Sequence, residues 1–144
     1  MSSYKFPLET LLNYRSAVAE KKMESLAIQE SKRRAIVNRL ALIQTEYKVC
    51  RDSGHSDKVD LGLLNQQMLH LDLLSKRANE QSLALEKAEK RVRKHREELV
   101  QAMKEKQMLE KLKDKKEHQY RMELSKLEAK ELDEIALIRP AKRK

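Results

Sequence analysis

The sequence predicts an all-α protein, specifically an antiparallel two-helix coiled-coil hairpin with a protruding C-terminal helix. Residues 64–138 contain neither glycine nor proline and are mostly strong helix formers. Charged residues make up 38% of the chain and aromatic residues only 3%, a composition typical of long helices rather than of a globule. The one cluster of turn-forming residues, at 51–57, separates two amphipathic segments, which favours a single helical hairpin over residues 1–144.

The first helix is expected at about residues 6–52. Pro7 suits a first helical turn, because the N–H that proline lacks would have no partner there, and the residues before position 6 are expected to fray. Steps of four and three residues then mark a coiled-coil seam of moderate quality. Its members are Leu8, Leu12, Arg15, Ala19, Lys22, Leu26, Gln29, Arg33, Ile36, Leu40, Ile43, Tyr47 and Cys50.

The turn is expected at about residues 53–60. Gly54 suits the left-handed position just beyond a helix end. Ser56, Asp57 and Asp60 are each suitable N-caps for the following helix.

The second helix is expected at about residues 61–138, with Gly62 a weak point in its first turn and a basic tail at 139–144. At 1.5 Å per residue, the stretch 64–138 would extend over roughly 110 Å, which predicts a rod. The expected seam changes phase several times, which would relax the supercoil locally. It comprises Leu64, Met68, Leu71, Ser75, Ala78, Leu85, Val92, Leu99, Met103, Leu109, Leu112, Tyr120, Leu124, Leu127 and Ile135.

The unequal helix lengths predict an unpaired end. If the turn centres near residue 56, facing positions have numbers that add to about 112, so Leu8 lies beside Lys104. Residues beyond about 108 would then have no partner from the first helix. The segment 109–138 is therefore predicted to be a lone amphipathic helix whose apolar stripe requires another protein.

Enzymatic chemistry is not expected. The two glycines stand apart and form no phosphate-binding loop, and acidic pairs lie on helices without a pocket. We expect no catalytic residue, metal site, cofactor or small-molecule ligand. No apolar run approaches the ~20 residues of a membrane span. The residues that could bind a metal are scattered along the chain: Cys50, His55, His70, His95 and His118.

The net charge of +9 indicates a partner with an acidic surface, a nucleic acid or an anionic lipid. Six basic residues lie close together in the second helix: Lys87, Lys90, Arg91, Arg93, Lys94 and Arg96. We interpret them as a solvated helix face with the ion pairs Glu86–Lys90 and Glu89–Arg93. A basic nucleic-acid-binding protein is one alternative. A structural coiled coil that forms homodimers through its exposed stripe is another.

Three stretches resemble the FliJ proteins of bacterial flagellar protein export. They read FPLETLLNYR at 6–15, LVQAMKEKQMLEKL at 99–112 and ELDEIA at 131–136. The likeness in length, single turn and basic balance extends over nearly the whole chain, and Pro7 is a mild departure from it. The resemblance implies a non-enzymatic component of the flagellar type III export apparatus, similar in fold to the central stalk of rotary ATPases.

The same resemblance implies the partners. A FliJ-like protein inserts into the ring of the flagellar export ATPase and promotes formation of the hexamer. It also contacts the cytoplasmic domain of the membrane export gate and the export chaperones. The resemblance thus implies a cytoplasmic protein peripherally associated with the membrane at the flagellar base.

Candidate contact residues follow from combining the unpaired end with the resemblance. The expected ATPase-ring contacts are Leu8, Leu12, Arg15, Leu112, Arg121, Leu124, Glu128, Asp133 and Glu134. The expected export-gate contacts lie near the hairpin turn, at Met68, Leu71 and Ser75.

Overall fold

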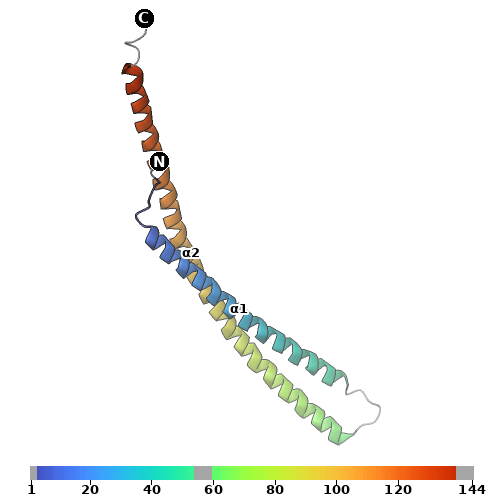
Figure 1. The fold of residues 1–144 in the computed structure, drawn as a ribbon. Coiled ribbons are helices and arrows are strands. Elements are labelled where there is room, and N and C mark those ends of the chain that lie inside the picture. The colour runs from blue at the N-terminus through green and yellow to red at the C-terminus, as the bar shows by residue number, and fades with distance from the viewer. Residues whose placement is uncertain (1–2, 54–59, 139–144) are drawn as a thin grey trace. The chain divides into compact units, whose positions relative to one another are not determined.

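The computed structural model describes residues 3–53 and 60–138, and within these ranges it contains two helices and no strand. Helix α1 covers Glu9–Asp52 and helix α2 covers Leu61–Ile138 (Figure 1). Residues early in α1 contact residues late in α2, so the helices pair antiparallel. The predicted all-α helical hairpin is confirmed.

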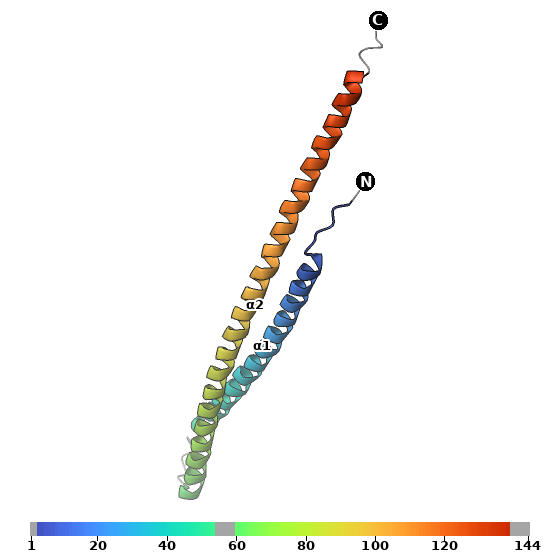
Figure 2. The same cartoon turned by 90° about the vertical axis from the view of Figure 1, so that its left-hand side faces the viewer.

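The chain divides into two compact units, each containing a segment of α1 and a segment of α2. Unit 1 comprises Met1–Glu20 and Gln101–Lys144, and unit 2 comprises Lys21–Val100. In unit 1, the blue start of α1 lies beside the orange part of α2 in Figure 1 and again in Figure 2, where the view is turned by 90°. The red end of α2 continues past the start of α1 in both views.

Helix α1 begins three residues later than the position expected from the sequence. Pro7 restricts the residue before it to extended conformations, so Phe6 stays outside the helix. The Phe6 carbonyl accepts a hydrogen bond from the Glu9 N–H at 3.2 Å, and its side chain is buried. The ring of Tyr4 lies 5.3 Å from that of Tyr120 in α2. Tyr4 and Phe6 therefore pack in unit 1, while the described residues before the helix have no helical structure.

The seam predicted for α1 is confirmed at every position except Leu8, which is 40% exposed. Leu12 and Ala19 are buried, and the other members are half-buried. Half-burial suits the polar members such as Lys22 and Arg33, because their alkyl stems can cover the partner helix while the charged ends reach water.

The seam of α2 differs from the prediction. A row in steps of four and three residues runs without a phase change from Gln67 to Lys113, and each member is buried or half-buried. Six predicted members lie on this row: Leu71, Ala78, Leu85, Val92, Leu99 and Leu109. Met68 and Ser75 lie beside it and are exposed, whereas Leu64 is in phase with it but is exposed before its first packed residue. Most of the other members were not recognised because they are polar or small. The members of the row are Gln67, Leu71, Leu74, Ala78, Gln81, Leu85, Ala88, Val92, His95, Leu99, Ala102, Lys106, Leu109 and Lys113.

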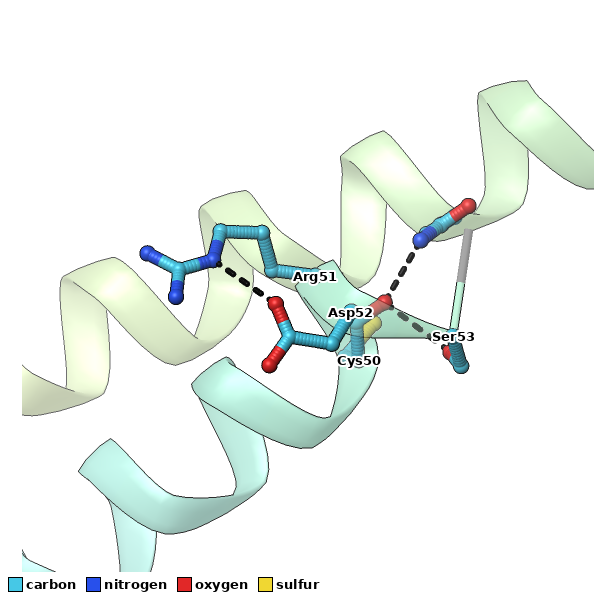
Figure 3. A network of polar contacts seen from close by, with 5 residues as sticks. Cys50, Arg51, Asp52 and Ser53 are labelled. Carbon is cyan, nitrogen blue, oxygen red and sulfur yellow. Dashed lines mark hydrogen bonds and ion pairs between the residues drawn. The ribbon is translucent and has the colours of Figure 1, made fainter. Parts of the chain in front are cut away.

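Side-chain hydrogen bonds mark both helix ends next to the turn. The Asp60 carboxylate accepts from the Gly62 N–H at 2.9 Å, which makes Asp60 the N-cap of α2. The Cys50 carbonyl accepts from the Ser53 hydroxyl at 3.0 Å and from the Gln67 amide at 2.5 Å (Figure 3). The other turn residues that were singled out, Gly54, Ser56 and Asp57, lie outside the described ranges.

Leu74 provides a direct test of the observed seam, because its side chain is fully buried while that of its neighbour Leu73 is 44% exposed. We expect Leu74→Ala to lower the free energy of unfolding by about 2–5 kcal/mol. Leu73→Ala should change it by only about 0.5 kcal/mol. Urea denaturation followed by circular dichroism measures both variants. Equal losses would contradict the seam described here.

Candidate functional site

In unit 1, two ion pairs fix the alignment of α1 with α2. The Lys113 ammonium lies 2.9 Å from the Glu9 carboxylate, and Arg15 forms an ion pair with Glu105. The numbers of the paired residues add to 122 and 120. Both pairs are partly shielded from water, and neither is buried.

In unit 2, two further ion pairs fix the alignment. Lys22 lies 3.1 Å from Glu98, and Arg96 lies 3.2 Å from Glu30. The numbers of these residues add to 120 and 126. The expected sum was about 112, so in each unit the facing residue of α2 lies eight or more positions further along than expected, a displacement of at least two helical turns.

The displaced register corrects the extent of the unpaired end. Lys113 pairs with Glu9, and Tyr120 contacts Tyr4, so α2 has partners well beyond residue 108. About half of the lone helix predicted at 109–138 therefore has partners, and only the remaining half is unpaired. The error arose because the turn was assumed to be symmetric, whereas the first six residues of α2 precede its first hydrogen bond to α1, at Gln67.

The last fourteen residues of α2, Ser125–Ile138, form the segment that we call the exposed end. Every side chain in it is exposed. Four acidic and two basic residues lie among five large apolar ones, so the segment is both acidic and apolar. Exposed apolar residues gathered in this way are a common feature of protein interaction sites. The apolar members are Leu127, Leu132, Ile135, Leu137 and Ile138.

The structure separates the residues predicted to contact the ATPase ring. Glu128, Asp133 and Glu134 lie in the exposed end, and Leu124 lies just before it, half-buried. Leu12 is buried between the helices and acts in packing. The remaining four lie in unit 1: Leu8 is exposed, Leu112 is half-buried, Arg15 is paired with Glu105, and Arg121 is paired with Glu117 at 2.9 Å.

Sequence reasoning did not include four exposed apolar residues near the C-terminal end of α2. They fall outside the predicted seam row. The signal that could have found them is the high number of apolar residues in a segment that has no partner from α1. They are Met122, Leu132, Leu137 and Ile138.

The predicted export-gate residues lie at the start of α2, in unit 2. Met68 is 60% exposed, Leu71 is half-buried in the seam, and Ser75 is exposed. Ser75 also lines a groove between the two helices, together with Ile43, Gln44, Tyr47, Lys48, Arg51, Leu74 and Ala78. The first turns of α2 also expose five leucines: Leu61, Leu63, Leu64, Leu69 and Leu73.

The cross-helix ion pairs change two pKa values. The hydrogen bond from Lys22, together with its positive charge, holds the pKa of Glu98 below its ordinary value. The hydrogen bond to Glu9 raises the pKa of Lys113, against an opposing effect of desolvation. Both shifts favour the charged forms, so the ion pairs persist at neutral pH.

Residues 3–53 and 60–138 contain no cluster of three or more potential metal-ligating side chains. Neither helix, over its described residues, carries a stretch both long and apolar enough to cross a bilayer.

Comparison with known protein families gives a match over nearly the whole chain. The family model described as "Flagellar FliJ protein" matches residues 4–144. No curated protein and no solved structure matches this chain.

The Lys22–Glu98 pair predicts a pH dependence of stability. Because the pKa of Glu98 is lowered on folding, its contribution is present above the unfolded value of 4.5 and is lost as the pH falls through the folded value. Lys22→Gln should therefore destabilise the protein at pH 7, and this loss should shrink as the pH falls below 4.5. Lys21→Gln, an exposed neighbour, should have no effect at any of these pH values. Urea denaturation over a series of decreasing pH measures this, and a loss that stays constant as the pH falls would contradict the assignment.

Proposed function

This chain belongs to the flagellar FliJ protein family and is related to flagellar protein export, and we propose that it acts there as a non-enzymatic coupling component. In this proposal, the C-terminal end of α2 enters the ring of the flagellar export ATPase and promotes assembly of the hexamer. The turn-proximal part of the hairpin contacts the cytoplasmic domain of the membrane export gate. Export chaperones are the third class of partner.

The exposed end carries the proposal. Ser125–Ile138 is a continuous helix whose apolar side chains have no segment of α1 beside them within the described residues. A helix of this kind gains most of its stability from burying its apolar stripe, so a partner that surrounds it would stabilise it strongly. A narrow ring pore is suited to a single helix, because it can contact all sides of it at once.

The acidic residues of this end would give the contact its specificity. Glu128, Asp133 and Glu134 are exposed and form no ion pair within the described part of the chain. Charged residues at an interface mainly steer association and exclude wrong partners, whereas buried apolar anchors supply most of the affinity. We therefore propose Leu132 and Ile135 as anchors, with the three carboxylates facing basic residues of the ring. Leu8, Arg15, Leu112, Arg121 and Leu124 would extend this contact along unit 1, and Leu12 would support it through packing.

The first experiment mixes the chain with its cognate export ATPase and measures ATP turnover and hexamer formation by sedimentation. We expect both to rise with the wild-type chain. Asp133→Lys with Glu134→Lys should reduce the stimulation at least tenfold, because the carboxylates would then repel a basic pore. Glu86→Lys with Glu97→Lys changes the net charge equally on exposed residues of unit 2 and should reduce it less than twofold. If both variants behave alike, net charge rather than the exposed end controls the ATPase.

Contact with the export gate is proposed for Met68, Leu71 and Ser75 at the start of α2. What supports it is the number of exposed apolar side chains there, Met68 and the neighbouring leucines, together with the groove that Ser75 lines. Patches that combine large apolar side chains with little charge are typical of protein contacts. Peripheral association with the membrane would follow from this contact and would need no membrane-spanning segment.

The second experiment tests the gate contact with two methionine variants. Met68→Ser should weaken binding to the isolated cytoplasmic domain of the gate protein by about tenfold, since it removes an exposed apolar anchor. It should leave stimulation of the ATPase unchanged. Met108→Ser, which alters an exposed methionine in unit 1, is the matched control and should not affect gate binding. Titration calorimetry measures both, and equal affinities for the gate domain would exclude this surface.

A further inference from the structure

The net positive charge of the chain is concentrated in two segments of unit 2. Residues 31–40 of α1 contain four basic residues and no acidic one, and residues 87–96 of α2 contain six basic residues and one acidic one. The whole chain has 32 basic and 23 acidic residues, so the remainder is balanced, with 22 of each. These two short segments therefore account for the entire charge of +9.

The two segments lie beside one another. The ion pairs Lys22–Glu98 and Glu30–Arg96 define the register on this part of the hairpin, and they align residues 31–40 with a part of α2 that overlaps 87–96. Ten helical residues extend over roughly 15 Å. Ten basic residues thus surround a short length of unit 2, where mutual repulsion destabilises the hairpin unless an anionic partner neutralises it.

The two flanks of this region differ. Glu30 and Arg96 each directly follow a seam residue, and their ion pair lies on one flank of the helix pair. Residues that directly precede a seam residue lie on the opposite flank, which we call the basic flank. It contains Lys32 and Arg39 of α1 and Arg91 of α2, with Lys87 and Lys94 one helical turn to either side of Arg91.

Four of the five cations of the basic flank have no acidic partner among the described residues, and Lys94 acts only through its charge on Glu98, whose pKa it helps to lower. All five side chains are exposed, and none takes part in an ion pair with a described residue. The ion pairs Glu86–Lys90 and Glu89–Arg93, expected from the sequence for this region, are also absent from the described structure. Instead, Arg96 reaches across to Glu30 at 3.2 Å.

A second row at coiled-coil spacing runs along the basic flank of α1. Its members are separated by steps of four and three residues, as in a helix-packing seam, and they alternate between apolar and cationic. The apolar members are exposed: Ile28 to 54% and Leu42 to 66%, with Ala35 between them. In order, the row is Ile28, Lys32, Ala35, Arg39 and Leu42.

We propose that the basic flank of unit 2 is a docking surface for an acidic amphipathic helix of another protein. Such a helix would place apolar residues against Ile28, Ala35 and Leu42 and carboxylates against Lys32, Arg39 and Arg91. It would pack against both helices and form a local three-helix arrangement. This inference goes beyond the proposed function, because it uses neither the exposed end of α2 nor the apolar start of that helix.

The chemistry of the flank argues against other polyanions. Its residues include no aromatic side chain on which a nucleic-acid base could stack or which could anchor a membrane interface. Two packed helices of about 10 Å diameter each are also too wide for the major groove of DNA, which is about 12 Å across. A folded acidic helix meets both the charge pattern and the apolar spacing.

The test uses a fluorescein-labelled 28-residue peptide designed as a helix, with leucine at seam spacing and glutamate at the flanking positions. Binding to the full chain is measured by fluorescence anisotropy at 150 mM salt. A peptide with glutamine in place of glutamate should bind at least tenfold more weakly.

Double variants of the protein distinguish binding at the basic flank from attraction by the overall positive charge. Lys32→Glu with Arg91→Glu should weaken peptide binding at least tenfold. Arg34→Glu with Arg93→Glu changes the charge equally on exposed residues of the opposite flank and should weaken it less than threefold. Ile28→Ser with Leu42→Ser should also weaken it at least fivefold, with unchanged helix content by circular dichroism.

Three outcomes would overturn the proposal. Equal losses in the two charge variants would show unspecific attraction. A 20-base-pair DNA duplex or vesicles with 30% anionic lipid that bind more tightly than the peptide, with the same dependence on Lys32 and Arg91, would show a different class of partner. Sedimentation of the chain alone as a dimer that the Lys32→Glu, Arg91→Glu variant dissociates would show that a second copy occupies the flank.

Discussion

The alignment of α1 with α2 is the constraint on which the other features depend. Only a narrow stripe of each helix is buried, and Leu12, Leu74 and Val92 are the large seam side chains within it. Burial of one such side chain stabilises by about 1.5–3 kcal/mol, whereas a partly exposed ion pair contributes at most about 1 kcal/mol. Packing therefore sets the alignment. The ion pairs discriminate between neighbouring registers, because a shift of one turn would move the charged partners away from each other.

The alignment creates the surfaces available to partners. It leaves Ser125–Ile138 without a helix beside it and keeps the first leucines of α2 outside the seam. It also brings the basic segments of α1 and α2 to the same level, although they are about fifty residues apart in the chain. The exposed end and the basic flank both extend along helices, which suits partners that bind by helix packing.

The sequence was sufficient to predict both helices, the seam of α1 and part of the seam of α2. In α1 the apolar positions recur often enough that even Arg15 and Arg33 were assigned correctly by interpolation. In α2 the apolar members of the row were found in part, but Gln67, Gln81 and Lys106 were missed because hydrophobicity does not mark polar seam positions. The register could not be predicted because it depends on how many residues the turn leaves unpaired on each side, and apolar spacing alone does not contain that number. The error moved the boundary of the unpaired end.

The spacing of the cross-helix contacts has a consequence for synthesis. Near the turn, Gln67 bonds to a residue 17 positions away, whereas Lys113 bonds to one 104 positions away. Contacts close together in the chain form at a lower entropic cost, so pairing should start at the turn and proceed outwards like a zipper. On the ribosome, the beginning of α1 then stays unpaired, with Leu12 exposed, until almost the whole polypeptide has emerged and its partner segment of α2 is available. The nascent chain would be most vulnerable to misassociation at the end that is made first.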